Sequence, residues 1–313
     1  MQNVDNIDNI YTIIRQLGGG NFSNIYLVKD QNNEECVARI RVNQINGFQQ
    51  ELQMTQRASD LNSKNIVHLK NHGTGTTTIG GNVQNNQNYL ILDYYPKRDL
   101  SLYINNMGLN EKYAKFFFGK ILRGVQELHE SGIYHRNLNI NTILFDKNYN
   151  PIISNFACAT NFIGNHLFGQ FGNPEFMPPQ MHNNQPYDGI KADIFSLGVI
   201  LFHLVFGRQG FAQAANNDPL YIFIINRNYD QFWNNLPPEI LNMQSNHEFK
   251  DLYLKMIDPD ERNRPDIREI LKHNFFKEIH NLDKNEYYIL EKEVIDVFID
   301  REYIINQINQ NML

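Results

Sequence analysis

The sequence predicts an α+β fold, with strands in the first third of the chain and helices in most of the remainder. Residues 10–42 have the composition of strands around a glycine-rich turn. Residues 110–130 place apolar side chains at helical spacing. Residues 277–313 combine acidic character with apolar residues near heptad spacing. These three stretches indicate a strand-rich first part, a helical second part and a helical C-terminal extension.

The composition indicates a globular protein with ample core material. The chain has 313 residues, of which 42% are hydrophobic, which suits one large two-lobed domain or two modest ones. Its 28 Lys+Arg against 34 Asp+Glu give a net charge of −6. Nucleic acids and anionic membranes attract positive surfaces, so we expect no nucleic-acid partner. The longest apolar run, Ile194 to Phe206, is shorter than the roughly 20 residues of a membrane span and predicts a buried helix.

The cysteine content and the N-terminal residues favour a cytoplasmic protein. Cys36 and Cys158 are the only cysteines, and one pair cannot build a disulfide framework in a chain of this size. Residues 1–5 have neither the basic flank nor the apolar core of a signal peptide. We expect both thiols to be reduced and the protein to be cytoplasmic.

The stretch from His135 to Leu144 reads H-R-N-L-N-I-N-T-I-L and follows the helix predicted over residues 110–130. It resembles the catalytic loop of eukaryotic protein kinases, H-R-D-L-K-x-x-N. Further kinase motifs follow in the family's order. They are Asn155-Phe156-Ala157 at the D-F-G place, Gly172 to Gln180 at G-T-x-x-[YF]-M-A-P-E, Asp193 to Gly198 at D-x-W-S-x-G, and Asp258 to Pro265 at D-P-x-x-R-x-R-P.

The resemblance covers residues 10–276 and implies a two-lobed protein-kinase fold. It places a small β-rich N-lobe with one main helix at residues 1–94 and a larger, mostly helical C-lobe at residues 95–276. An acidic helical extension, residues 277–313, lies beyond the family's boundary. This tail either folds back on its own domain or binds a partner, and the sequence does not separate the two.

The resemblance also implies a remnant nucleotide pocket. Small residues in the glycine-rich loop let backbone N–H groups approach phosphates. The strand and hinge over residues 89–95 would bind adenine through backbone groups, and Asp99 would lie near the ribose, although a helix N-cap is an equally good interpretation. The residues assigned to this pocket are Gly18, Gly20, Ile25, Ala38, Asp93, Tyr95, Asp99 and Leu144.

Kinases carry a phosphate-binding Lys in the strand that corresponds to residues 35–42. If Ala38 matches the family's Ala, the Lys place is Ile40; with a turn one residue shorter, it is Arg39. Glu51, in a predicted helix, stands about where kinases have the Glu that pairs with this Lys. A solvated carboxylate is an equally good interpretation of Glu51.

The polar residues of the expected catalytic site are replaced. Asn137 stands for the catalytic base, and an amide cannot accept a proton at neutral pH. Asn139 stands for the neighbouring Lys, while Thr142 and Asn155 stand for the metal ligands. Mg²⁺ is usually held through carboxylates and phosphates, so magnesium binding is not expected. No cofactor is required on this view, and ATP could bind without a metal.

These replacements predict a pseudokinase without competent catalytic residues. Such a protein would be an interaction scaffold or an allosteric regulator of a protein partner, for example a true kinase. The alternative is an atypical Ser/Thr protein kinase with weak ATP-dependent phosphotransfer.

Other positions bear on structure and regulation. The resemblance implies that Asp193 supports the catalytic loop's backbone. It also implies that Arg264 pairs with a Glu whose place Gln180 takes, so that a hydrogen bond replaces an ion pair. Residues 161–171 contain no Ser, Thr or Tyr, which excludes phosphorylation within that stretch.

Overall fold

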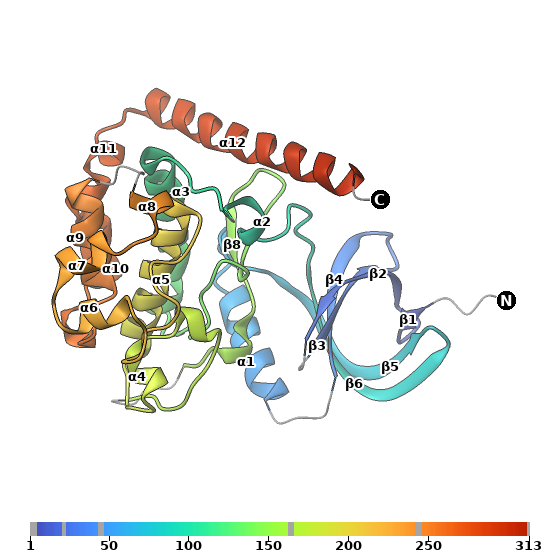
Figure 1. The fold of residues 1–313 in the computed structure, drawn as a ribbon. Coiled ribbons are helices and arrows are strands. Elements are labelled where there is room, and N and C mark those ends of the chain that lie inside the picture. The colour runs from blue at the N-terminus through green and yellow to red at the C-terminus, as the bar shows by residue number, and fades with distance from the viewer. Residues whose placement is uncertain are drawn as a thin grey trace.

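The computed structural model describes residues 5–20, 23–42, 47–104, 106–161, 166–241 and 246–311. Strands and helices are both present, so the α+β prediction is confirmed, and their mixture fits a two-lobed kinase fold. In Figure 1 the strands β1–β6 gather on one side, most helices lie on the other, and the helix α12 runs along the top.

Six antiparallel strands form a closed barrel in the order β1-β2-β3-β4-β6-β5. Side chains alternate between the two faces of each strand, and one set forms a buried cluster that includes Val28, Ala38 and Ile91. The strands are β1 (Asn6–Ile7), β2 (Tyr11–Gly19), β3 (Ser23–Lys29), β4 (Glu35–Arg41), β5 (Leu69–Ile79) and β6 (Asn82–Asp93).

Two turns of the barrel correspond to predicted features. The glycine-rich turn joins β2 to β3, and the Gly20 N–H donates to the Ser23 carbonyl at 3.0 Å; Asn21 and Phe22 lie outside the described residues. The polar residues 71–88, whose Gly, Thr, Asn and Gln content predicts a hairpin, form the hairpin of β5 and β6. Gly80 and Gly81 make its turn with positive φ angles of 56° and 78°, which glycine adopts without steric cost.

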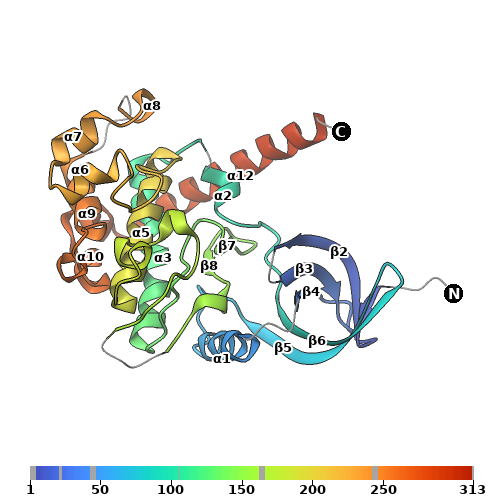
Figure 2. The same ribbon diagram turned by 60° about the horizontal axis from the view of Figure 1, so that its bottom comes forward.

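The helix α1 (Phe48–Ser59) lies beside β5, between the barrel and the helical part, as Figure 2 shows. Phe48 packs in a small buried cluster with Leu69 and Leu90. This contact fixes the face of α1 that carries Glu51, which is 2% exposed. The packing therefore turns a carboxylate toward the interior.

The helical part is built around α5 (Gly189–Phe206). The Asp188 side chain accepts from the Lys191 N–H at the start of this helix, and Gly207 ends it with a left-handed φ of 70°. By length and composition α5 could cross a membrane, but it is almost wholly buried within the protein. Buried core helices have the same length and apolar composition. The prediction of a buried helix over Ile194 to Phe206 is therefore confirmed.

The helix predicted over residues 110–130 is α3, whose first turn is capped by the Asn110 side chain through the Tyr113 N–H at 2.9 Å. The remaining elements of this part are mostly short. They are α2 (Ser101–Ile104), α3 (Glu111–Glu130), β7 (Ile143–Phe145), β8 (Pro151–Ile153), η1 (Phe156–Cys158), η2 (Pro174–Phe176), α4 (Pro179–His182), α6 (Tyr221–Ile225), α7 (Tyr229–Asn234), α8 (Pro238–Leu241), α9 (His247–Met256), η3 (Glu261–Asn263), α10 (Ile267–Lys272), η4 (Asn274–Phe276) and α11 (Lys277–His280).

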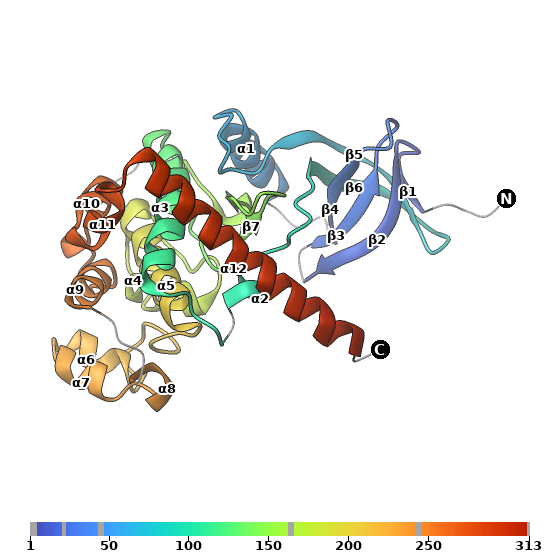
Figure 3. The ribbon, with the colours of Figure 1, turned by 90° about the horizontal axis from the view of Figure 1, so that it is seen from above.

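The last element, α12 (Lys284–Asn311), crosses α3 and α2 on the outside of the helical part (Figure 3). Phe298 is fully buried, and its ring lies 4.8 Å from that of Phe145 and 5.2 Å from that of Phe117. One face of the tail is thus folded back on its own chain.

Candidate active site

A cleft with a volume of about 510 Å³ opens between the barrel and the helical part. Apolar side chains from the strands form much of its wall, and three arginines add positive charge. The lining residues are Arg15, Leu17, Ile25, Val37, Arg39, Val67, Leu92, Asp93, Tyr94, Tyr95, Pro96, Arg98, Asp99, Asn141, Leu144, Ser154 and Asn155.

The cleft brings together most of the predicted nucleotide-pocket residues. Gly18 and Gly20 are not among the residues that line it, and no atom lies within 4 Å of where their Cβ atoms would be. Ala38 is fully buried in the barrel. Those that do line the cleft are Ile25, Asp93, Tyr95, Asp99 and Leu144.

Two of these residues have further structural properties. Burial raises the pKa of Tyr95 to about 12, so its phenol stays protonated at neutral pH. Asp99 Oδ1 accepts from the Ser101 N–H at 3.1 Å, at the start of α2. Asp99 therefore both lines the cleft and satisfies a backbone donor at the start of a helix.

The register of β4 corrects the predicted lysine position. Ala38 pairs with Tyr26 and Ile91, and Ala38 and Ile40 belong to the barrel's buried cluster. The alternate residues Val37 and Arg39 line the cleft. The assignment of Ala38 to the adenine pocket and of Ile40 to the lysine place is therefore wrong, and Arg39 occupies that place.

Arg39 is the centre of a charged network at the back of the cleft. Its Nε lies 3.0 Å from Glu51 Oε1, and Arg41 Nη2 lies 2.9 Å from Glu51 Oε2. Arg39 Nη1 also donates to Asn155 Oδ1 at 2.8 Å. Glu51 is thus a buried, doubly paired carboxylate rather than a solvated one. Two guanidinium groups against one carboxylate leave an excess of one positive charge beside the cleft.

Asp193 of α5 holds the backbone of the candidate catalytic loop, and its side chain is fully buried. Its carboxylate accepts from the backbone N–H groups of His135 and Arg136, both at 2.8 Å, and lies 2.9 Å from His129 Nε2. These bonds fix the loop's backbone, including the positive φ of 58° at Arg136, and match the supporting role that the resemblance implies for Asp193.

His135 is a neutral packing residue. Burial lowers its pKa, so the imidazole carries no charge at neutral pH. Nε2–H donates to the Ser154 carbonyl at 2.9 Å, and Nδ1 accepts from the Asn137 N–H at 3.3 Å. The ring packs edge-on against Phe156 at 5.1 Å between centroids. His135 therefore joins the catalytic loop to the Asn155-Phe156-Ala157 segment.

Asn137 and its neighbours use their polar atoms within the loop. Asn137 Oδ1 accepts from the Asn173 backbone N–H and from Asn139 Nδ2, both at 3.0 Å. The Thr142 hydroxyl donates to the Asn139 carbonyl at 2.9 Å and accepts from the Asn139 N–H at 3.0 Å. These amides and this hydroxyl hold the loop in shape, and none of them is a base.

The donor set does not fit a resident magnesium ion. Asn155 Oδ1 is bound by Arg39, and the Thr142 hydroxyl is bound within the loop. Among the described residues no group of three or more His, Cys, Asp or Glu side chains could hold a metal. Mg²⁺ is usually bound through one or two carboxylates plus phosphates, and these neutral groups offer no such charge.

Arg136 contacts two described residues that follow Ala157, Cys158 and Phe171. The Arg136 guanidinium lies 4.0 Å from the centroid of the Phe171 ring, and its Nε donates to the Cys158 carbonyl at 2.7 Å. A side chain at Gly172 would bring a Cβ to 2.7 Å from the Arg136 carbonyl oxygen. Cation–π stacking and this close backbone approach thus position Asn173 over the catalytic loop.

Arg264 is the other buried cation of the predicted motifs, and it is 1% exposed. Its three donors reach the carbonyls of Asp258 and Lys191 and the Gln180 Oε1 atom at 2.8, 3.0 and 2.8 Å. The predicted hydrogen bond between Arg264 and Gln180 is confirmed. Burial lowers the pKa of Arg264 to about 10, which leaves it charged at neutral pH.

Sequence reasoning missed two of the cleft's arginines, Arg15 and Arg98. Arg15 lies two residues before Leu17 on β2, so the period of two along a strand could have placed both on the cleft's wall. Arg98 adopts a left-handed φ of 64° after the hinge. No local sequence signal predicts that conformation for an arginine.

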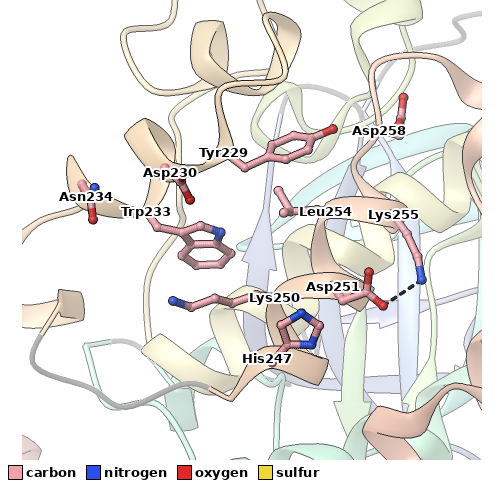
Figure 4. A pocket seen from close by; sticks show the side chains of 10 residues that line it. All are labelled: Tyr229, Asp230, Trp233, Asn234, His247, Lys250, Asp251, Leu254, Lys255 and Asp258. Atoms are coloured by element: carbon pink, nitrogen blue, oxygen red, sulfur yellow. Dashed lines mark hydrogen bonds and ion pairs between the residues drawn. The ribbon is translucent and has the colours of Figure 1, made fainter.

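A second hollow, of about 430 Å³, lies between α7 and α9, away from the cleft (Figure 4). Asp251 lies between two bases, 2.7 Å from Lys255 Nζ and 2.8 Å from His273 Nε2. The Lys250 ammonium lies 5.0 Å from the centroid of the Trp233 ring. Most of its charged groups already have partners, so the larger cleft is the candidate active site.

The chain is similar in sequence to known proteins. Residues 11–276 match the family model described as the protein kinase domain. CBL-interacting protein kinase 26 of Oryza sativa subsp. japonica is 28% identical over 271 residues, 85% of this chain and 52% of the relative. Serine/threonine-protein kinase GIN4 of Saccharomyces cerevisiae is 32% identical over 210 residues, 66% and 18%. Serine/threonine-protein kinase chk1 of Schizosaccharomyces pombe is 28% identical over 239 residues, 71% and 45%.

These similarities overturn the predicted function. The relatives are named serine/threonine kinases, so the prediction of a pseudokinase that acts as a scaffold or regulator is wrong, and the leaning against an enzyme is unsupported. The alternative, a Ser/Thr protein kinase, fits the relatives better. The chain spans about half the length, or less, of the curated relatives it matches.

Proposed function

Because this chain belongs to the protein kinase family, we propose that it is an atypical Ser/Thr protein kinase that transfers the γ-phosphoryl group of ATP slowly to protein hydroxyl groups. The names of the relatives support the reaction class. The replaced polar residues of the catalytic loop support the low rate.

The main support for the proposal is Arg39, a cation that lines the cleft and forms an ion pair with the buried carboxylate of Glu51. Arg39 is paired with Glu51 at 3.0 Å and bonded to Asn155 at 2.8 Å. A guanidinium is always charged and presents a planar set of donors that suits phosphate oxygens. Arg39 is thus suited to the phosphate-binding role of the family's Lys, and Arg15 adds a second positive charge to the cleft wall.

The apolar wall of the cleft suits an adenine ring. Leu17, Ile25 and Val37 come from the barrel, and Leu144 comes from β7 on the opposite side. A planar base between such side chains gains burial and dispersion contacts. Asp93, Tyr94 and Tyr95 also line the cleft; the Asp93 N–H donates to the His68 carbonyl at 3.1 Å and the Tyr95 carbonyl accepts from the Arg98 N–H at 3.2 Å.

The reaction places little covalent demand on the protein. The substrate hydroxyl oxygen would attack the γ-phosphorus, and the bond from that phosphorus to the oxygen retained by ADP would break. Asn137 cannot accept the hydroxyl proton, so the proton passes to a phosphoryl oxygen or to water. Phosphoryl transfer depends chiefly on positioning and charge stabilisation. Loss of a general base costs about 10²- to 10⁴-fold in rate, so we expect turnover that is slow by that factor.

The proposed nucleotide is ATP whose phosphate charge is met by arginines rather than by a resident magnesium ion. The neutral groups of Asn155 and Thr142 support this view, because carboxylates are the usual protein ligands for Mg²⁺. We therefore expect ATP to raise the unfolding temperature equally in EDTA and in magnesium.

The test measures transfer of radiolabelled phosphate from ATP to a Ser/Thr peptide library by the purified chain. The Arg39→Ala variant should lose most of the incorporation and bind ATP about tenfold more weakly, since it loses the cation that faces the phosphates. The Val37→Phe variant should block the cleft and abolish both binding and transfer.

The matched control is Arg262→Ala, the same substitution at a guanidinium whose side chain is 86% exposed and remote from the cleft. It should keep wild-type transfer. Incorporation that persists in Val37→Phe would come from a contaminating kinase and would contradict the proposal, as would complete absence of transfer by the wild-type chain.

We also propose a division of the chain into two lobes and an extension. We place an N-lobe at residues 1–94, a C-lobe at residues 95–276 and an extension at residues 277–313. The end of β6 at Asp93 and of η4 at Phe276 supports these boundaries. The free thiols of Cys36 and Cys158 support a reducing, cytoplasmic location.

A further inference from the structure

The helix α12 is held along one side only. Leu290, Val294 and Phe298 are 1%, 3% and 0% exposed and pack on the helical part. Polar contacts fix the same side further along. Arg301 donates to the carbonyls of Met107 and Gly108 at 2.7 and 2.8 Å. These contacts make the helix a rigid part of the molecule as far as Glu302.

The opposite side of α12 carries exposed apolar side chains, which we call the outer face. At 3.6 residues per turn, Tyr288, Ile299 and Tyr303 fall within roughly 60° of one another around the helix axis. Single exposed apolar residues are ordinary, but a row of them along one rigid helix is typical of an interaction surface. The outer face consists of Tyr288, Ile289, Ile299 and Tyr303, which are 46–66% exposed and fall within about 100° around the axis.

The last turns of α12 extend past α2 and away from the helical part (Figure 3). Glu302 makes the last recorded polar contact, with Lys97 at 2.7 Å and with the Tyr149 hydroxyl. Within the described chain, residues 303–308 have no hydrogen bond, ion pair or ring contact beyond their own helix. Ile304 and Ile308 thus project on a helix that the protein itself does not cover.

The charge of the outer face selects its occupant. Glu293, Asp296 and Asp300 are exposed, and no ion pair within 4 Å is recorded for them among the described residues. The exposed cations of α12 are Lys284 and Lys292, and the Lys292 ammonium lies 4.5 Å from the centroid of the Tyr288 ring. With Glu286, four exposed carboxylates face two exposed lysines on α12, and this negative excess disfavours an anionic membrane and a second copy of the same helix.

We propose that the outer face of α12 binds a basic amphipathic helix of a partner protein. The 28-residue α12 is about 42 Å long and offers exposed apolar side chains beside carboxylates rather than a pocket, which suits another helix lying alongside it. Apolar residues of the partner pack against Ile299 and Tyr303, and its Lys or Arg side chains meet Asp296 and Asp300.

The test uses the full chain and fluorescein-labelled peptides of 18 residues with a Leu/Ile row flanked by Lys, read by fluorescence anisotropy. A peptide with Glu in place of every Lys is the charge control. We expect saturable binding of the Lys peptide that weakens about tenfold or more in the Ile299→Ser/Tyr303→Ser variant. Reversing charge with Asp296→Lys/Asp300→Lys should weaken it similarly and reduce its salt dependence.

Matched controls are Ile10→Ser, an exposed apolar residue on the barrel, and Glu127→Lys, an exposed residue of α3; both should bind as wild type. Equal binding of the Lys and Glu peptides, or no saturable binding of the Lys peptide, would overturn the proposal. So would a dimer in analytical ultracentrifugation that the Ile299→Ser/Tyr303→Ser variant abolishes, since the occupant would then be a second copy.

Discussion

Two guanidinium sites, Arg39 in the cleft and Arg264 at the base of the helical part, stand where the family pairs a cation with a glutamate. In the cleft the carboxylate is present and the cation is Arg instead of Lys, so Arg39 and Glu51 lie 3.0 Å apart. At the base the Arg is present and the carboxylate is an amide, so Arg264 donates to Gln180 at 2.8 Å. The cleft has an ion pair whose cation is Arg39. At the base, a hydrogen bond from the charged Arg264 to the neutral amide of Gln180 takes the place of an ion pair.

The difference teaches what each site needs. Arg264 is buried and donates to two carbonyls and an amide, which bond three of its five N–H groups without a direct ion pair. Arg39 lines the back of an open cleft, where the buried carboxylate of Glu51 positions its guanidinium. Hydrogen bonds to neutral oxygens are sufficient to hold Arg264 at the base of the helical part. In the cleft, the Glu51 carboxylate fixes the position of the Arg39 charge.

The largest expected effect comes from removing the buried cation. Arg264→Ala leaves two carbonyls and the Gln180 amide oxygen without donors and creates a cavity, so the free energy of unfolding should fall by about 3–5 kcal/mol in urea denaturation. Arg262→Ala, at an 86% exposed side chain, should change it by less than about 0.5 kcal/mol. A loss as small as the control's would mean that water replaces the guanidinium.

Removing the carboxylate at the other site should cost less. Glu51→Gln leaves Arg39 and Arg41 as neighbouring cations that are 14% and 11% exposed, so solvent relieves part of the repulsion. We expect the free energy of unfolding to fall by about 2 kcal/mol. Glu127→Gln on α3 is the control at an exposed carboxylate. If both variants unfold alike, the doubly paired carboxylate is not what holds this site.

His203 is a buried basic side chain that differs from Arg39 and Arg264, because burial keeps it uncharged at neutral pH. It is 7% exposed and stacks on Phe176 at 5.8 Å, and burial lowers its pKa to about 4. An unfolded histidine titrates near pH 6.5, so the unfolded state binds more protons than the folded state between pH 6.5 and 4. The stabilisation is therefore complete above pH 6.5 and is lost as the pH falls toward 4.

The corresponding measurement is the free energy of unfolding at pH 7 and pH 5 for the wild type and His203→Phe. The wild type should lose roughly 2 kcal/mol more than the variant over this interval, because only the wild type must exclude a proton from this site. Parallel losses in the two proteins would assign the acid sensitivity to other groups.

The smallest effect comes from rebuilding the missing ion pair. Gln180→Glu places a carboxylate beside the Arg264 guanidinium, and we expect a gain of about 1 kcal/mol in the free energy of unfolding, since desolvation of the new charge offsets much of the attraction. A double-mutant cycle with Arg264→Ala isolates the pair. A coupling energy of zero would show that the amide already serves as well as a carboxylate.

The sequence predicted the order of elements and much of the cleft, but it left the register of β4 open. Both Ala38 and Val37 can occupy a strand interior, so the period of two has no preferred phase in E-C-V-A-R-I-R. The barrel decides it, because Ala38 and Ile40 belong to its buried cluster and the alternate residue Val37 lines the cleft. Once that phase is set, Arg39 reaches the cleft and Glu51 acquires its partner.

The function was harder to predict than the fold. Asn137, Asn139 and Asn155 were identified from motifs, and their hydrogen bonds explain how amides hold the loop. Residue identity alone nevertheless favoured the wrong functional class. The arginines at positions 15, 39 and 98 meet only in the folded cleft, so their combined charge could not be estimated from their places in the chain.

The docking of α12 has a consequence for the order of folding. Its contacts join residues far apart in the chain: Arg301 and Tyr103 are 198 positions apart, and Glu302 and Lys97 are 205 apart. Such long-range contacts close slowly, and during synthesis they form only after residues 301 and 302 have emerged. Phe298 completes an aromatic cluster with Tyr103, Phe117 and Phe145. Until Phe298 docks, the helical part exposes the apolar surface that this ring covers.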